Sequence, residues 1–183
     1  MLKPKEVESS IEVISNPKIL CASPSAHRLS FDSDVQMLSD IFPGDITPES
    51  RLTGEKLRSL LTNNKFDILH LLLAVAPDGT VHFSESDSIP LDGFTNLIEV
   101  SGANLLVLAS CHSIYLATTL AGKVNMISAI GTPTDKEFVS WEKAFYQLLS
   151  KGYALSRSFE ISRSVTKMPA VLVMKSDTIF KRS

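Results

Sequence analysis

The chain has 183 residues, of which 44% are hydrophobic and 21% are charged, and its formal net charge is −2. This length is enough for one domain with a hydrophobic core, and the nearly balanced charge gives no electrostatic reason to expect nucleic acid or an anionic membrane as a partner. No apolar run is long enough to span a bilayer, and residues 1–10 lack the apolar core of a secretory signal. Two cysteines are too few for a disulfide framework or a metal cluster, so we expect a cytoplasmic protein with no cofactor.

The first sixteen residues are polar and are expected to form a flexible N-terminal tail, followed by a single domain at 17–183. The apolar run "KILCAS", residues 18–23, predicts a buried strand that ends at Pro24. Residues 31–42 have apolar side chains at helical spacing and predict a helix.

A second helix is predicted over 53–64, with Thr53 as its N-cap. "FDILHLLLAV", residues 66–75, is too continuously apolar for a half-exposed strand and predicts a buried one. The dipeptide Asp78-Gly79 then predicts a hairpin that returns antiparallel through "TVHFS".

The second half of the chain alternates helices and strands. Helices are expected over 94–100, 113–122, 135–152 and 154–165, and strands over 104–110, 124–130 and 169–175. Such alternation predicts an α/β domain with a mostly parallel central sheet and helices on both faces.

In open α/β sheets, binding sites form beyond the carboxyl ends of the strands. Cys111 lies at such an end, just after "LLVLAS" and just before a helix that begins near Ser113. This position suits a nucleophile, because a helix N-terminus lowers the pKa of a thiol and offers N–H groups to an oxyanion. The alternative is that Cys111 is a small core hydrophobe, as most free cysteines are. Cys21, inside the first strand, is expected in the core.

The order of the motifs "FDILHLLLAVAPDG", "LLVLASCHS" and "AFYQLLSKGYALSRSF" resembles the CHAT family of caspase-like cysteine peptidases. In that family a strand carries a His-x-x-Gly-His-Gly motif, the next central strand ends in Cys-x-Ser, and a helix with Phe-Tyr-x-x-Leu-x-x-Gly follows. "SCHS" also resembles the cysteine motif of the related metacaspases. The resemblance covers roughly residues 17–175 and implies a caspase-like fold. Four residues match the helix pattern: Phe145, Tyr146, Leu149 and Gly152.

The sequence departs from this pattern where the chemistry would occur. His70 aligns with the first histidine of the family motif, but the second, which is the catalytic base, falls on Ala74, and the following glycine on Val75. Metacaspases have an acidic residue two positions before the cysteine, which selects basic substrates, and Ala109 occupies that position here. Ile114 occupies the position of the glycine that usually follows Cys-x-Ser. The nucleophile's position is therefore kept, whereas the base and its flanking glycine are not.

Four histidines remain as candidate bases. His70 lies four strand residues, or roughly 13 Å, before position 74, which exceeds hydrogen-bond reach, so a buried structural imidazole is the alternative. His112 starts the helix beside Cys111, and its ring should point elsewhere. His27, in a polar loop, is expected to be solvated.

His82 depends on the length of the hairpin loop. With two or four loop residues it pairs with Val75 and faces away from position 74, whereas with three it pairs with Ala76 and shares the face of Ala74. The candidate catalytic residues are thus Cys111, His82 and His70.

The resemblance and its departures lead to three readings. The first is a catalytically impaired pseudo-peptidase that binds a protein partner, and CHAT-like domains imply a bacterial signalling or defence setting. The second is an active cysteine endopeptidase that cleaves a peptide substrate with Cys111 and a displaced base, His82. The third is a structural domain of a larger assembly. The oligomeric state stays open.

Overall fold

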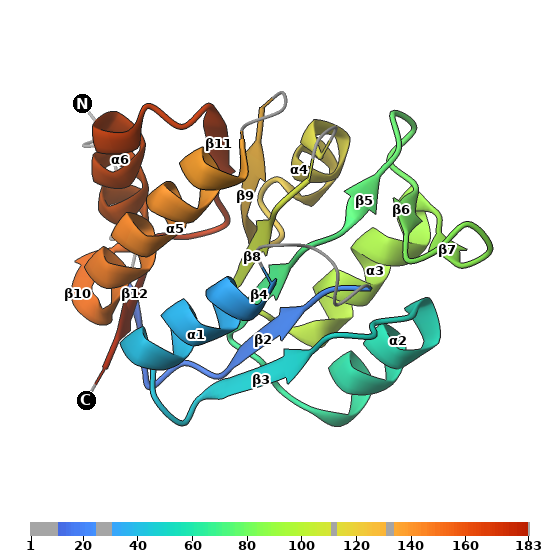
Figure 1. The fold of residues 1–183 in the computed structure, drawn as a ribbon, viewed down its shortest axis with the longest axis horizontal. Coiled ribbons are helices and arrows are strands. Elements are labelled where there is room, and N and C mark those ends of the chain that lie inside the picture. The colour runs from blue at the N-terminus through green and yellow to red at the C-terminus, as the bar shows by residue number, and fades with distance from the viewer. Residues whose placement is uncertain (1–10, 25–30, 111–112, 131–133, 183) are drawn as a thin grey trace, which may run out of the picture.

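A computed structural model describes residues 11–24, 31–110, 113–130 and 134–182 of the chain (Figure 1). Within these residues the central sheet follows the strand order β3 (Ile46–Glu49), β2 (Ile19–Ala22), β4 (Ile68–Leu71), β8 (Leu105–Leu108), β9 (Asn125–Ala129) and β11 (Ala170–Val173). The first five of these strands pair in parallel, and β11 is antiparallel to β9. The α/β class predicted from the sequence is confirmed, with a mixed sheet.

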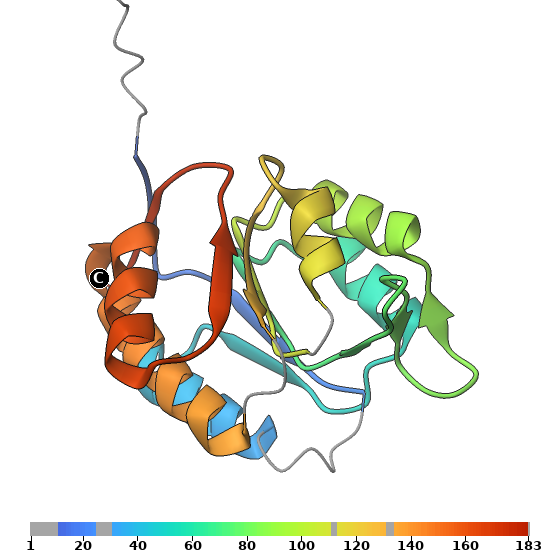
Figure 2. The ribbon, with the colours of Figure 1, turned by 90° about the horizontal axis from the view of Figure 1, so that it is seen from above.

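Helices cover both faces of this sheet (Figure 2). One face carries α1 (Phe31–Ile41), α5 (Asp135–Ser150) and α6 (Leu155–Thr166), and the other carries α2 (Gly54–Asn63), α3 (Leu91–Ser101) and α4 (Ile114–Leu120). Side chains alternate along each strand, so Ile19 and Cys21 enter the core beneath α1 and α5, while Leu20 and Ala22 enter the opposite core. Because both faces of the sheet are buried in a core, the central strands are continuous apolar runs in the sequence.

A second sheet lies beside the first and has the order β1 (Glu12–Ser15), β12 (Thr178–Lys181) and β10 (Lys151–Ala154). Strand β1 is parallel to β12, with Glu12 opposite Thr178 and Ser15 opposite Lys181. Residues 12–15, which the sequence places in the flexible tail, therefore form a strand. Three of these four residues are exposed, and their pairing partner lies more than 160 residues away in the sequence.

The long strand expected over 66–75 is divided. Strand β4 ends at Leu71, and β5 (Ala74–Val75) leaves the central sheet to pair with β6 (Val81–His82), which pairs with β7 (Ser88–Ile89). The backbone N–H of Leu72 still donates to Ala22 O at 2.9 Å, so the chain diverges only after that residue. The hairpin predicted from Asp78-Gly79 is confirmed.

Helix α5 holds one face of the sheet. It begins with a capping box, in which Thr134 and Glu137 each accept a hydrogen bond from the other's backbone N–H. Trp141, Phe145 and Leu149 are fully buried against the sheet, as their spacing predicts. In the described ranges, every helix is too short or too polar to cross a bilayer.

Candidate functional site

The segments that follow β4 and β8 stay side by side beyond the carboxyl end of the sheet. Ala109 N donates to Leu71 O at 3.1 Å, and Val75 N donates to the Ser110 hydroxyl at 3.1 Å. Ser110, the last described residue before Cys111, is therefore bonded to the segment that contains Ala74. Cys111 itself lies outside the described residues, as do His112 and His27.

The chain is described again from Ser113, which is the N-cap residue of α4, where the sequence predicts a helix start. The Ser113 hydroxyl donates to Ser110 O at 3.1 Å and lies 2.6 Å from the Ser128 hydroxyl in β9. These contacts connect Ser113 to Ser110, the last described residue before it, and to β9. With seven residues, α4 is short, so its dipole adds little to the site.

Ala74 and Val75 differ sharply in environment. Ala74 is exposed, whereas Val75 is buried in the core beneath α2, α3 and α4. The position that the resemblance assigns to the catalytic base thus faces outward from the protein core, but its methyl group can neither accept nor donate a proton.

His82 lies directly opposite Ala74 in the β5–β6 ladder. The connection has three residues, 77–79, because Ala76 N donates to Thr80 O at 2.9 Å. The expectation that a three-residue loop puts His82 on the face of Ala74 is confirmed, although its partner is Ala74 and not Ala76. Side chains opposite each other in an antiparallel pair have Cβ atoms about 4.5–5.5 Å apart. The half-buried imidazole of His82 therefore lies beside position 74.

His70 lies elsewhere. Its side chain is fully buried on the face that α1 and α5 cover, and its Nδ1 is 2.9 Å from the Tyr146 hydroxyl. Its Nε2 is 3.2 Å from Glu142 Oε1 and 3.8 Å from Asp34 Oδ2. This environment favours the structural alternative for His70, and the partners of its imidazole come from helices α1 and α5.

The environment of His70 is unusual for a protein interior, because two carboxyl groups are buried beside it. Burial raises the pKa of Glu142 well above its usual range, and the nearby Asp34 raises it further. Burial also raises the pKa of Tyr146, with a further contribution from Glu142. Cys21 lies opposite His70 in the β2–β4 ladder, and burial, followed by the charges of Asp34 and Glu142, raises the pKa of its thiol.

Sequence reasoning missed Asp34 and Glu142. Both occupy positions of an apolar helical stripe, since Asp34 lies between the buried Phe31 and Leu38, and Glu142 lies one position after the buried Trp141 and four before the buried Tyr146. An acidic residue at a core position of an amphipathic helix is the signal that could have identified them.

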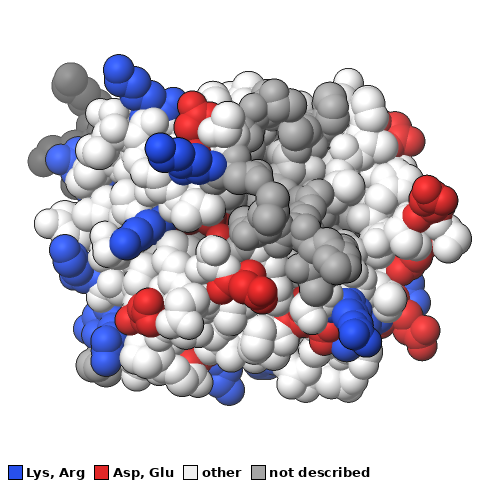
Figure 3. All heavy atoms as spheres, viewed as in Figure 1, with Lys and Arg blue, Asp and Glu red and all other residues white. Residues whose placement is uncertain are grey.

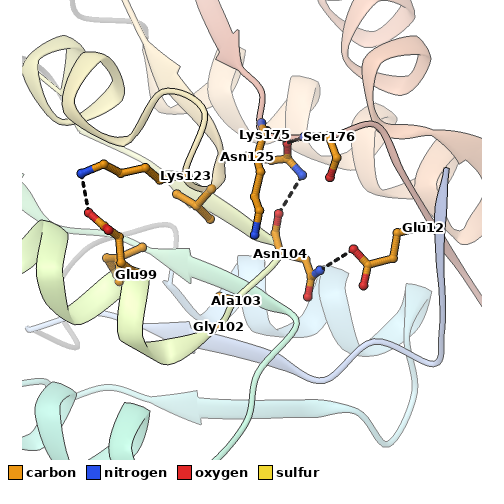
Figure 4. A pocket seen from close by; sticks show the side chains of 11 residues that line it. Glu12, Glu99, Gly102, Ala103, Asn104, Lys123, Asn125, Lys175 and Ser176 are labelled. Carbon is orange, nitrogen blue, oxygen red and sulfur yellow. Dashed lines mark hydrogen bonds and ion pairs between the residues drawn. The ribbon is translucent and has the colours of Figure 1, made fainter. Parts of the chain in front are cut away.

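A small cavity of about 60 Å³ lies at the opposite, amino end of β8 and β9 (Figure 4). Asn125 organises this region, since its side-chain amide donates to Asn104 O at 2.9 Å and accepts from the backbone of Lys175 and Ser176. Glu12 accepts from the Asn104 side chain at 3.0 Å. These polar groups bind one another, so the cavity is a structural junction between the two sheets.

A surface groove of about 750 Å³ runs between α1 and α5. Its lining includes Asp32, Asp40 and Lys143. On this side of the molecule, acidic and basic side chains are interspersed among uncharged ones (Figure 3).

Comparison of the sequence with protein-family models and with curated proteins finds no match. The geometry defines an α/β protein in which the segments after β4 and β8 are hydrogen-bonded to each other, with a buried cluster of ionisable groups under α1 and α5.

Proposed function

We propose that this chain is a caspase-like, CHAT-type domain that has lost the usual catalytic base and acts by binding a protein partner, in a bacterial signalling or defence system. The observation that carries the proposal is the exposed methyl group of Ala74 at the carboxyl edge, in a segment bonded to the residue before Cys111.

Two features of the fold support the caspase-like part of the proposal. Strands β4 and β8, which carry the two halves of the family motif, are parallel neighbours. Tyr146, from the late helical motif, contacts His70, from the first motif, at 2.9 Å. Residues far apart in the sequence that make the resemblance thus also contact one another.

Loss of the base changes the function of the crevice that a caspase-like fold implies at the carboxyl edge of β4 and β8. Without an imidazole to pair with it, the Cys111 thiol stays largely protonated at neutral pH and attacks carbonyls slowly. A peptide held in the crevice would then be bound and released uncleaved. His70 is a poor substitute, because it is buried and held by Tyr146.

The position of His82 supports a second candidate, an active cysteine endopeptidase. His82 is opposite Ala74, so its ring can occupy the space of the missing base. In this reaction the Cys111 thiolate attacks the scissile carbonyl, and the protonated His82 donates its proton to the leaving amine. Water then hydrolyses the thioester, which releases the acid and regenerates the thiol.

The alkylation rate of Cys111 by iodoacetamide from pH 5 to 9 separates the two candidates. The other cysteine, Cys21, is buried and the pKa of its thiol is raised, so alkylation of the native protein measures the reaction at Cys111. A pseudo-peptidase gives a simple thiol profile that His82→Ala leaves unchanged. The active peptidase would instead give rapid alkylation at pH 6, which His82→Ala abolishes and Ser88→Ala, on the neighbouring strand, retains. That result would refute the pseudo-peptidase.

Partner binding is tested by photo-crosslinking in the cells that naturally make the protein. A benzophenone amino acid replaces Ala74 in one variant and Val165, an exposed residue of α6, in the control. The proposal expects a discrete protein adduct from position 74 and none from position 165. Equal adducts from both positions, or none from position 74, would contradict binding at the crevice.

A further inference from the structure

We propose that Asp34, His70 and Glu142 bind a divalent metal ion such as zinc, between the central sheet and helices α1 and α5. The site lies inside the core and does not rest on the proposed function. Each ligand comes from a different element, so the ion would join α1, β4 and α5.

The spacing of the three side chains suits one ion. One ligand atom from each residue lies within 4.8 Å of the others. His70 Nε2 is 3.2 Å from Glu142 Oε1 and 3.8 Å from Asp34 Oδ2. A tetrahedral zinc ion with bonds of about 2.0–2.2 Å holds its ligand atoms roughly 3.3–3.6 Å apart. The observed distances fall on either side of that spacing, and small side-chain rotations would equalise them.

Unpaired buried atoms point to a missing partner. Among the described residues, both carboxylate oxygens of Asp34, both of Glu142 and Nε2 of His70 are buried without a hydrogen bond. Native proteins leave only a few buried polar groups unpaired, because the lost hydration of such a group is not replaced. Here five atoms from three residues converge on one place, and a single cation would supply a partner to all three side chains.

The other ring nitrogen of His70 is already oriented. Its Nδ1 lies 2.9 Å from the Tyr146 hydroxyl, which can accept the Nδ1 proton. In that tautomer Nε2 presents a lone pair to the two carboxyl groups, which is repulsive unless a cation, or a proton on one of the carboxyl groups, lies between them. A histidine ligand commonly donates its second N–H to an oxygen in this way, which fixes the ring toward the metal.

Charge and donor type narrow the choice of ion. Two carboxylates and a neutral imidazole balance a divalent cation, so the occupied site is neutral in the core. Imidazole together with carboxylate suits zinc, manganese and iron, whereas magnesium and calcium prefer oxygen ligands alone. The alternative occupant is protons, with His70 protonated and one proton shared between the two carboxyl groups.

The test measures metal content and its effect on stability in the full chain, with any affinity tag removed. Protein made in zinc-supplemented medium is analysed for metal by mass spectrometry, and thermal unfolding is followed before and after chelation. Glu142→Gln removes one ligand at constant shape, and Glu137→Gln, exposed on the same helix, is the matched control.

The proposal expects one ion per chain in the parent and in Glu137→Gln, a lower melting temperature after chelation, and recovery on adding Zn²⁺. Glu142→Gln should lose the ion and respond to neither treatment. If that variant does not fold, a titration of the chelated parent with Co²⁺ decides, since a visible absorption band that saturates at one equivalent supports the site. Parent protein without metal that responds to neither Zn²⁺ nor Co²⁺, or a Glu142→Gln variant that keeps its ion, would overturn the proposal in favour of the proton-sharing cluster.

Discussion

Replacement of Trp141, the only tryptophan, should measure how strongly α5 holds the sheet. Its indole is fully buried, stacked on Phe145 with ring centroids 5.1 Å apart, and edge-on to Phe159 at 6.4 Å. Trp141→Ala leaves a large cavity and should lower the free energy of unfolding by about 3–5 kcal/mol. For a chain of this size that corresponds to a fall in melting temperature of roughly 6–20 °C.

Trp141→Phe provides the matched comparison. It keeps a ring against Phe145 and removes the indole Nε1, which is buried without a hydrogen bond among the described residues. Relief of that unpaired donor offsets part of the lost volume, so we expect a cost of only about 1–2 kcal/mol. Urea unfolding followed by far-ultraviolet circular dichroism measures both variants without relying on tryptophan fluorescence. A cost below about 1 kcal/mol for Trp141→Ala, or equal costs for both variants, would refute this account of the core.

Three further predictions concern the crevice and the backbone. Ala74→His should speed alkylation of Cys111 about tenfold at pH 6. A thiol pKa lowered from about 8.5 to about 6 raises the thiolate fraction more than it weakens the nucleophile. An unchanged pH profile would mean that position 74 does not face Cys111. Gly79→Ala should lower the free energy of unfolding in urea more than Gly102→Ala does. Both glycines have positive φ, but an added Cβ at Gly79 would lie 3.0 Å from Leu91, so equal losses would show that Leu91 moves freely. Asn125→Ala should lower the free energy of unfolding by about 2–4 kcal/mol. It should also speed amide exchange at residues 175 and 176, which lose their acceptor, and unchanged exchange would contradict the role of Asn125 as that acceptor.

Much of the central architecture could be predicted from local pattern. The runs around Leu20, Leu69, Leu106 and Ile127 are apolar on both faces because helices cover both sides of the sheet, so each reads as a strand without knowledge of its neighbours. Strands β1, β10 and β12 are short and partly exposed, and only pairing with distant segments defines them. No local pattern carries that information.

The candidate site shows the same division. The sequence could place Ser110 just beyond the end of β8, because that strand end follows from the apolar run, but it did not predict that β4 ends at Leu71, before position 74. It could not place His82, since a change of one residue in the hairpin loop turns the imidazole to the other face. The convergence of Asp34 and Glu142 on His70 depends on how two helices cross the sheet, although the acidic residues in their apolar stripes were visible in the sequence.

The pairing of β1 with β12 determines how the domain bears mechanical load. The two strands are parallel, so residue 11 enters at one end of the pair and residue 182 leaves at the other. A force that pulls these ends apart acts along the strands, and the ladder hydrogen bonds must then break together and not one after another. The Asn16 N–H, which donates to Lys181 O at 2.8 Å, extends this ladder by one bond. Tension transmitted through a flanking chain would therefore meet its main resistance in this small sheet, before it reaches the carboxyl edge of β4 and β8.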